Sequence, residues 1–459
     1  MSTKPDKDNG PKINLREGVI LGPYMRGRSA LPRYRKNVVL PRVELPKHVL
    51  VTGSPGMGKS WTSLFLAFQI ALMDNTQVLY WDGKGDLENA QRFLALMRLA
   101  RRDARIFPNE PINIWRGDWS VISNHMLDAI TFATSGPVSY YRETAKLAIQ
   151  LICRHPDGPP RSSQEFIDRF NLLVLRSVYE SIPEIQVIEE KELNDNLKRY
   201  LAFFGQIGTV LDGDWSYEDV EAAYLLTNSA VLREETDALT RMLFSDFVDY
   251  FERRKDPETL CVMFVDEFTA IAHYKDLALL LEQARSFNTS MVLIPQTLAG
   301  IGDIAMVRRI IGATKTKIMH AHPEPEELSR LAGQMKVPDL TYRLDENFET
   351  EGGLLRMIEV PRIDPEDIRN MGVGTAWVIF GSSAFKVQMK TAPHVELEPL
   401  PAAADILRPL KERRRPIGRR PSYGKGAKGG APSDPDERRK WQDSETKKAN
   451  FDYLKNLDS

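Results

Sequence analysis

The residues with the clearest chemistry form a glycine-rich loop at positions 53–60. The loop reads Gly-Ser-Pro-Gly-Met-Gly-Lys-Ser and fits the pattern of a phosphate-binding loop at every position. In such a loop, small residues let backbone N–H groups surround a β-phosphate. The lysine contacts the β- and γ-phosphates, and the serine hydroxyl binds Mg²⁺. The alternative is a glycine-rich turn without a ligand. The pattern predicts that ATP or GTP binds to the whole loop, which consists of Gly53, Ser54, Pro55, Gly56, Met57, Gly58, Lys59 and Ser60.

A pair of carboxylates, Asp266 and Glu267, can supply the other half of this chemistry. The pair follows the apolar run 260–265, which we predict to be a buried strand. An aspartate at the end of a core strand can hold Mg²⁺ through its water shell, and a neighbouring glutamate can polarise the attacking water. The alternative is that both carboxylates cap a helix at 268–274. With the loop upstream, we interpret Asp266 as a metal residue, like Ser60, and Glu267 as a catalytic residue.

Two further residues, Arg285 and Gln296, follow at positions suited to a γ-phosphate. Gln296 lies at the end of a predicted strand at 291–294, where a polar side chain can contact that phosphate and sense its loss. Arg285 follows a predicted helix at 277–284 and is less suited to reach a nucleotide on its own chain. It could enter the site of a neighbouring subunit as an arginine finger. By spacing alone, Arg285 is more typical of a solvated arginine at a helix end.

These residues require a sheet whose strands end along one edge. Strands predicted at 48–52, 77–81 and 104–107 alternate with helices at 61–73 and 87–101. Such alternation indicates a parallel, doubly wound sheet. The same signal returns in strands predicted at 260–265, 291–294, 317–319 and 376–380. We therefore predict an α/β fold with a P-loop (RecA-like) core sheet and helices on both of its faces.

Between residues 127 and 257 the strand signal disappears, and amphipathic helical segments follow one another. Helices are predicted at 162–181, 189–205 and 234–254, which indicates an all-α subdomain inserted into the core. The predicted organisation has a polar N-terminal segment with entry strands at 1–30 and a first part of the ATPase core at 31–126. The all-α insert at 127–257, a second part of the core at 258–395 and a basic flexible tail at 396–459 follow.

Composition permits a motor of this kind without identifying its partner. The chain has 459 residues, 42% of them hydrophobic, and a formal net charge of −1. Binding of nucleic acid would therefore be local, at the basic stretches 24–47 and 408–428, for which a solvated surface is the alternative. Cys153 and Cys261 lie in apolar segments, which predicts buried thiols in a reducing compartment. No apolar run has the length of a signal peptide or a membrane span, so we expect a cytoplasmic protein.

The order of these motifs resembles that of the conjugative coupling proteins of type IV secretion, which belong to the HerA–FtsK superfamily of hexameric DNA-pumping ATPases. The resemblance extends from about Leu31 to Pro393. It rests on His48-Val-Leu-Val before the loop, Trp81-Asp-Gly-Lys-Gly-Asp86, Phe264-Val-Asp-Glu-Phe268 and Ala284-Arg-Ser-Phe-Asn-Thr-Ser-Met-Val-Leu-Ile-Pro-Gln296. The segment with Asp82 and Lys84, and the spacing of Arg285 and Gln296, are more specific than the phosphate-binding loop.

The resemblance implies a hexameric, ATP- and Mg²⁺-dependent DNA translocase. It assigns Lys59, Glu267, Arg285 and Gln296 to catalysis, with Arg285 as an arginine finger across the subunit interface and Gln296 as the γ-phosphate sensor. It also implies that the insert binds a relaxase or other secretion substrate. Membrane-anchored members begin with transmembrane helices, whereas this chain starts almost at the motor domain. We therefore expect a coupling protein without its own anchor, free in the cytoplasm or recruited to the inner face of the cell membrane by a separate membrane subunit.

Two other functions are compatible with the sequence. One is a soluble HerA/FtsK-type helicase-translocase in DNA processing or defence, with a nuclease as partner. The other is an ATP-gated module that recruits protein and whose ATPase activity is indifferent to DNA.

Overall fold

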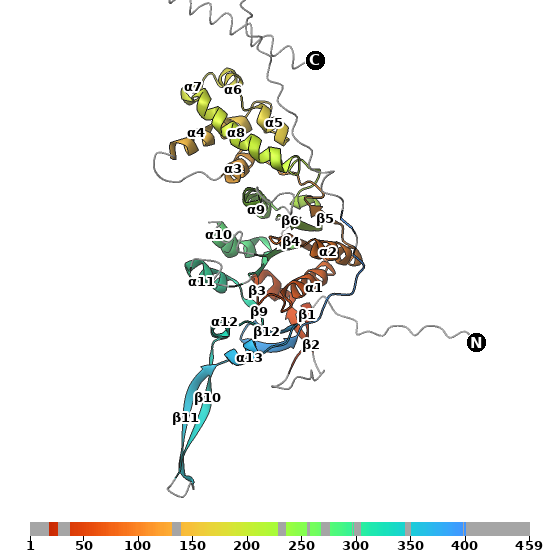
Figure 1. The fold of residues 1–459 in the computed structure, drawn as a ribbon, viewed down its shortest axis with the longest axis vertical. Coiled ribbons are helices and arrows are strands. Elements are labelled where there is room, and N and C mark those ends of the chain that lie inside the picture. Colours follow the sequence, from red (N-terminus) through yellow and green to blue (C-terminus); the bar gives the residue numbers. More distant parts are fainter. Residues whose placement is uncertain are drawn as a thin grey trace, which may run out of the picture. The chain divides into compact units, whose positions relative to one another are not determined.

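A mostly parallel β-sheet forms the centre of the protein (Figure 1). The structure, a computed structural model, describes residues 18–25, 37–130, 139–227, 236–254, 258–267, 276–295, 297, 304–344, 350–397 and 399–400. Within these residues the sheet has nine strands in the order β13-β12-β9-β3-β8-β7-β4-β6-β5. In this order they are β13 (Ser383–Gln388), β12 (Thr375–Phe380), β9 (Thr316–His320), β3 (Val49–Thr52), β8 (Thr289–Ile294), β7 (Leu260–Asp266), β4 (Thr76–Asp82), β6 (Ala222–Leu226) and β5 (Ala104–Phe107).

The strands from β9 to β5 pair in parallel, and β12 and β13 add an antiparallel edge. A parallel strand needs a crossover connection before its neighbour, and the intervening helices provide it. The predicted parallel sheet is confirmed. All of the described residues lie in one compact unit.

Helices cover both faces of the sheet, as predicted. The central strands β3, β4, β7 and β8 are buried along their whole length, which is typical of strands with helices on both sides. In β7, Phe264 belongs to one hydrophobic cluster and Met263 to another. On the side of Phe264 lie α1 (Lys59–Ala71) and α2 (Leu87–Leu99), and on the side of Met263 lie α9 (Thr236–Arg253), α10 (Asp276–Gln283) and α11 (Ile304–Ala313).

A helical region built around aromatic side chains precedes α9. Its helices are α3 (Trp119–Ala129), α4 (Ser139–Cys153), α5 (Ser163–Asp168), α6 (Leu172–Val178), α7 (Pro183–Val187) and α8 (Glu190–Ile207). The ring of Phe166 lies 5.1 Å from that of Tyr200 and 5.2 Å from that of Phe170. The single helix predicted at 162–181 is two helices, because the Asn171 side chain accepts a hydrogen bond from the Leu173 N–H and starts α6.

One strand, β6, lies inside the range 127–257 for which the sequence predicts helices alone. It pairs in parallel with β4 and β5, and all five of its residues are buried. Its sequence, Ala-Ala-Tyr-Leu-Leu, is a short apolar run that periodicity cannot distinguish from a buried helix. The prediction of helices alone is therefore corrected at β6, which belongs to the central sheet.

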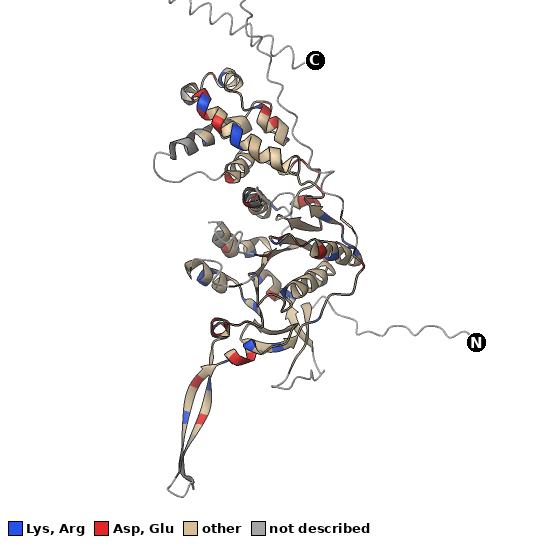
Figure 2. Ribbon diagram, in the orientation of Figure 1, with Lys and Arg blue, Asp and Glu red and all other residues tan. Residues whose placement is uncertain are grey.

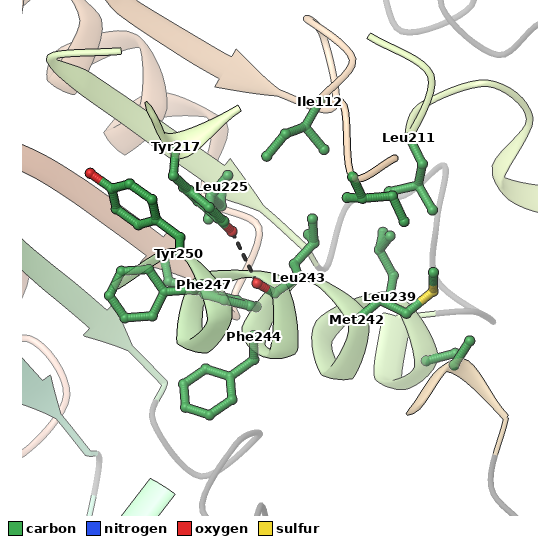
Figure 3. Close-up of a cluster of buried hydrophobic side chains, with 14 of the residues drawn as sticks. Ile112, Leu211, Tyr217, Leu225, Leu239, Met242, Leu243, Phe244, Phe247 and Tyr250 are labelled. Atoms are coloured by element: carbon green, nitrogen blue, oxygen red, sulfur yellow. Dashed lines mark hydrogen bonds between the residues drawn. The ribbon is translucent and has the colours of Figure 1, made fainter. Parts of the chain in front are cut away.

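Helix α9 joins the sheet to the helical region (Figure 3). Its Leu239, Met242, Leu243, Phe244 and Phe247 side chains form a buried cluster with residues of both parts. The cluster includes Leu225 from β6, Ile112 and Leu211 from the connecting segments, and Tyr217 from the 3-10 helix η2 (Tyr217–Asp219). The Tyr217 hydroxyl donates a hydrogen bond of 3.1 Å to the Leu243 carbonyl oxygen. Most of these side chains are apolar, so burial rather than polar contact holds α9 in place.

Smaller elements complete the described structure. β1 (Gly18–Pro23) and β2 (Asn37–Pro41) form an antiparallel pair, and η1 (Arg42–Lys47) leads into β3. β1 lies within the range predicted for entry strands, 1–30, whereas β2 lies beyond it. After β9 come α12 (Pro325–Leu331), a hairpin of β10 (Gln334–Leu344) and β11 (Thr350–Pro361), and α13 (Pro365–Arg369). The sequence did not predict this hairpin. Cys153 and Cys261 are buried free thiols, as predicted, and burial raises the pKa of each to about 12.

Candidate nucleotide-binding site

The loop between β3 and α1 has a backbone that only glycine adopts readily. Gly53, Gly56 and Gly58 have φ angles of 146°, 79° and 105°. Gly58 is the N-cap of α1, which begins at Lys59. The unpaired N–H groups of the first helical turn therefore lie at the loop, together with the positive end of the helix dipole. This is the conformation that a phosphate cradle requires.

Lys59 extends back over this loop. Its ammonium donates a hydrogen bond to the carbonyl oxygen of Gly53, and its side chain is buried. Burial lowers the pKa of Lys59, and the charge of Lys84 lowers it further, whereas Asp266 and Glu267 raise it. An anionic phosphate at the loop would stabilise the charged ammonium in the same way as these carboxylates.

Ser60 and Asp266, the two predicted metal residues, lie side by side. The Ser60 hydroxyl donates a hydrogen bond of 3.4 Å to Oδ2 of Asp266, although the residues come from α1 and from the end of β7. Asp266 is buried, with 2% of its surface exposed. A serine hydroxyl beside a strand-end carboxylate is the pair that holds Mg²⁺ in P-loop nucleotide sites, so these residues fit the ion.

Glu267 follows Asp266 in a left-handed conformation, with a φ of 62°. This conformation is uncommon for a residue with a side chain and tends to occur at functional sites. The Glu267 N–H donates a hydrogen bond of 3.0 Å to Oδ1 of Asp266, and its side chain is half-buried. The turn at Glu267 is therefore held against the carboxylate of Asp266.

Asp82 organises the turn that presents Lys84. Its carboxylate accepts hydrogen bonds from the backbone N–H groups of Lys84, Gly85 and Asp86 at 2.7, 3.1 and 2.8 Å. The Tyr224 hydroxyl donates a fourth at 2.9 Å. Burial raises the pKa of Asp82, and these hydrogen bonds oppose the increase. Lys84 in turn forms a 2.7 Å ion pair with Asp266, so the segment singled out in the sequence is part of the site.

His320, which the sequence analysis did not identify, packs against the loop at Gly53. It is fully buried at the end of β9, and its Nε2 accepts a hydrogen bond of 3.1 Å from the Thr62 hydroxyl. Its Nδ1 donates at 3.1 Å to the Thr375 carbonyl oxygen, so one neutral tautomer satisfies both contacts. Burial lowers its pKa to about 4. A polar residue at the end of a buried strand was the only signal in the sequence.

The close approach of His320 explains the glycine at position 53. A Cβ on Gly53 would lie 2.5 Å from Cβ of His320. The backbone adds two further contacts, from the Ser54 N–H to the Ala321 carbonyl oxygen at 2.9 Å and from the Gly374 N–H to the Met57 carbonyl oxygen at 3.2 Å. The loop is therefore held by residues that flank β9 and β12.

Arg285 lies apart from the residues that meet at the loop. It is exposed on the 3-10 helix η4 (Ala284–Phe287), which precedes β8, whereas the loop follows the parallel neighbour β3. Arg285 therefore lies where β3 and β8 begin, at the opposite end of these strands from the loop. Its charge helps to lower the pKa of His48, which lies just before β3. The predicted γ-phosphate sensor, Gln296, and the predicted helix at 268–274 lie outside the described residues.

Solved structures of a conjugative coupling protein have the same architecture. The unbound bacterial conjugative coupling protein TrwBdeltaN70 matches 79% of this chain and 89% of its own length, with a TM-score of 0.58 and 18% identity. The chain has the fold of a conjugative coupling protein of the P-loop ATPase type. The plasmid coupling protein TrwB in complex with ADP and Mg²⁺ matches with a TM-score of 0.56 and 18% identity over 79% of this chain and 89% of that one.

VirB4 of Thermoanaerobacter pseudethanolicus shares this fold too, with a TM-score of 0.51 and 14% identity over 82% of this chain and 97% of its own. No protein-family model matches the sequence, nor does any curated protein. In the part of the chain that the structure describes, no helix is both long and apolar enough to cross a membrane.

Proposed function

We propose that this chain is an ATP-driven DNA translocase that acts as the coupling protein of a type IV secretion or conjugation system. One observation carries the proposal. The strand-end site brings together Lys59, Ser60, Lys84 and Asp266, whereas Arg285 lies at the opposite end, where β8 begins. The fold shared with TrwB and VirB4 supports it, because the coupling protein TrwB has been solved with ADP and Mg²⁺ and with an ATP analogue.

Within one subunit, the loop residues bind the triphosphate. Lys59 contacts the β- and γ-phosphates, and Ser60 and Asp266 hold Mg²⁺, which neutralises charge on the phosphates. Glu267 orients the attacking water and accepts its proton, and Gln296 senses the γ-phosphate. Lys84 is held by the Asp82 turn close enough to Asp266 to stabilise negative charge that develops during hydrolysis.

Arg285 acts on the nucleotide of a neighbouring subunit. β8 has six residues, and a strand of this length spans about 20 Å at about 3.3 Å per residue. This distance is longer than an arginine side chain, so a residue before β8 is remote from a nucleotide at the opposite ends of β3 and β7. An arginine finger at this end of the strands reaches a nucleotide only on a neighbouring subunit. This supports a closed ring, which we propose to be a hexamer.

In this proposal, the ring holds DNA by its phosphate backbone, and residues 127–257 bind a relaxase or another secretion substrate. Contacts with phosphates release counterions, so DNA binding weakens steeply as salt increases. The protein acts in the cytoplasm and can be recruited to the inner face of the membrane by a separate membrane subunit.

The test is ATPase activity with and without DNA for the wild type, Lys59→Ala and Arg285→Ala. DNA should stimulate the wild type. Loss of Lys59 should lower kcat on the order of 10²-fold or more, and loss of an arginine finger about 10³-fold. Arg161→Ala is the matched control, because Arg161 is an exposed arginine in the helical region. It should keep wild-type activity.

Three results would change the proposal. Full activity in Arg285→Ala would contradict the finger. ATPase activity indifferent to DNA, with tight binding of a protein through residues 127–257, would favour the protein-recruitment module. Copurification with a nuclease instead of a relaxase would favour the helicase-translocase of DNA processing or defence.

A further inference from the structure

The 3-10 helix η4, which carries Arg285, is held at both ends by other elements. Lys and Arg residues occur throughout the described chain (Figure 2), so an exposed arginine does not by itself indicate a finger. η4 has four residues, Ala284–Phe287. A 3-10 helix of this length has poor hydrogen-bond geometry, and its last carbonyl groups have no partner within the helix. The contacts around η4 therefore determine the direction in which it presents Arg285.

Arg254, which directly follows α9, holds the end of η4. Its guanidinium donates a hydrogen bond of 3.1 Å to the Phe287 carbonyl oxygen, with the Asn288 carbonyl oxygen at 3.5 Å. It also donates to the Thr289 hydroxyl at 3.1 Å, where β8 begins, and to the Thr259 carbonyl oxygen just before β7. A guanidinium suits this place because its donors form a rigid, planar fork, and a cation is favourable at the carbonyl end of a helix. One side chain therefore joins the end of η4 to the starts of two core strands.

Helix α9 adds an apolar contact to this polar one. The ring centroids of Phe251 in α9 and Phe287 in η4 lie 5.3 Å apart, at an interplanar angle of 77°. This is the edge-to-face arrangement that aromatic pairs prefer. Phe251 is buried, and it lies about one helical turn before Arg254. The end of α9 therefore holds the end of η4 through two residues.

His48 holds the turn before η4. Its Nδ1 accepts a hydrogen bond of 3.0 Å from the Met291 N–H in β8, which leaves Nε2–H to donate one of 2.8 Å to the Leu281 carbonyl oxygen in α10. In a continuous α-helix this carbonyl would accept the Arg285 N–H, but α10 ends at Gln283. His48 is buried and has a φ of 57°, a conformation that costs free energy and persists where the surrounding structure fixes it. The start of β3 therefore fixes the place where α10 tightens into η4.

We propose that Arg254 is a positioning residue for Arg285. It fixes the end of η4, His48 fixes the turn before it, and Arg285 lies between these two points. Arg254 is remote from the nucleotide of its own subunit, because it precedes β7 whereas Asp266 ends that strand. It acts through η4, by setting the direction in which the finger enters the neighbouring site. This inference rests on the proposed arginine finger and names the residue that aims it.

Loss of Arg254 should slow hydrolysis without weakening nucleotide binding. Displacement of a catalytic group by about 1 Å can cost on the order of 10²-fold in rate. Arg254→Met removes the donors and leaves an unbranched apolar side chain. We therefore expect kcat to fall by about tenfold to 10²-fold, with KM for ATP unchanged because the phosphate-binding loop is intact.

The test places Arg254→Met on one or the other chain of a mixed assembly. Chains with Lys59→Ala give a finger but lack a working nucleotide site, whereas chains with Arg285→Ala have the site but no finger. Activity in the mixture therefore comes from interfaces that join an intact site to an intact finger. Arg254→Met on the Lys59→Ala chain should lower this activity by about tenfold to 10²-fold. On the Arg285→Ala chain it should have no effect, because that chain has no finger to position.

A structural role alone would give a different result. If Arg254→Met only destabilised the fold, it would lower the activity of the mixture equally on either chain, and that outcome would overturn the inference. Arg254→Lys on the Lys59→Ala chain should recover part of the activity, because an ammonium can still donate to one carbonyl oxygen of η4. Arg253→Met is the matched control, since Arg253 is exposed at the end of α9 and donates to the Asp249 carbonyl oxygen in the same helix. It should leave the activity unchanged on either chain.

A second measurement requires neither a ring nor hydrolysis. A nitroxide spin label is attached to Ser286→Cys, beside the finger on the exposed side of η4, whereas Cys153 and Cys261 are buried. The label should move more freely in Arg254→Lys and Arg254→Met than in the chain that keeps Arg254. A label at Leu173→Cys on α6, where Leu173 is 57% exposed, should show no change. Equal mobility at position 286 with and without Arg254 would overturn the inference.

The outcomes separate this inference from the proposed function. If the mixture of Lys59→Ala and Arg285→Ala is no more active than the separate variants, the finger fails and this inference fails with it. If that mixture is active, and Arg254→Met on the Lys59→Ala chain leaves it unchanged, the finger stands and only the role of Arg254 is wrong.

Discussion

The ammonium of Lys84 lies 2.7 Å from Oδ1 of Asp266, although the two residues are far apart in the sequence. They meet because β4 and β7 are neighbours in the sheet, with Asp82 and Asp266 in register at their ends. Asp82 fixes the turn, and Lys84 crosses to the next strand. The two acidic strand ends therefore form one site with the loop at 53–60.

Replacement of Lys84 by Met should impair catalysis more than folding. Asp266 is buried, and Lys84 is the cation paired with it at the site. We expect kcat for ATP to fall about 10²-fold, with partial recovery in Lys84→Arg, because a positioned cation near developing charge contributes that much. Lys198→Met is the control, because Lys198 lies exposed on α8. Wild-type kcat in Lys84→Met would show that the ion pair is structural only.

Replacement of Gly53 by Ala should damage the loop. The new Cβ would lie 2.5 Å from Cβ of His320, and the φ of Gly53 is 146°. We expect a loss of stability of about 1–3 kcal/mol and a nucleotide affinity at least about tenfold weaker. Thermal melts and titration with a fluorescent nucleotide measure these effects.

Gly205→Ala is the matched control for this substitution. Gly205 lies within α8, and a Cβ there meets no atom within 4 Å. Alanine in a helix should stabilise the protein by about 0.5–1 kcal/mol. Equal melting temperatures for the two glycine variants would contradict the close packing of His320 on the loop.

His320 should make the fold sensitive to acid. Its pKa in the folded protein is about 4, below its ordinary value of 6.5, because burial disfavours the charged ring. Below pH 6.5 the His320 ring binds a proton in the unfolded chain, whereas in the folded chain it binds one only near pH 4. The free energy of unfolding should therefore decrease by about 3 kcal/mol from this residue over that interval.

Denaturant unfolding at several values between pH 7 and pH 4 measures this effect. His320→Gln should be less stable than the wild type at pH 7 but should lose less stability on acidification. The pKa of His48 is also lowered to about 4 by burial. His48 remains in the variant, so part of the pH dependence of the free energy of unfolding should remain. If the free energy of unfolding of His320→Gln depended on pH as strongly as that of the wild type, His320 would not be a neutral, buried ring.

Local patterns in the sequence predicted the core well. The apolar runs before Gly53 and Asp266 are buried strands, as expected, because a parallel strand covered on both faces is apolar along its length. The same pattern failed for β6, since five apolar residues suit a helix or a strand equally well. The hairpin of β10 and β11 was not predicted either, because Pro338 and the charged residues interrupt its alternation.

Contacts between distant segments were not predictable from spacing. His320 lies beside Gly53 only because β9 pairs with β3. Local sequence patterns do not predict the order of strands in a sheet. The position of Arg285 before β8 became informative only when β3 and β8 proved to be parallel neighbours. The role of Arg285 stays a prediction, as does that of Gln296.

Mixing Lys59→Ala with Arg285→Ala tests the central claim most directly. Each variant alone should hydrolyse ATP poorly, because one lacks the phosphate-binding lysine and the other lacks the finger. In an equal mixture, about a quarter of the interfaces join an intact nucleotide site to an intact finger from a Lys59→Ala neighbour. The account predicts DNA-stimulated ATPase activity well above the sum of the separate variants. A mixture no more active than that sum, from proteins that assemble together, would contradict a site completed by Arg285 of an adjacent subunit.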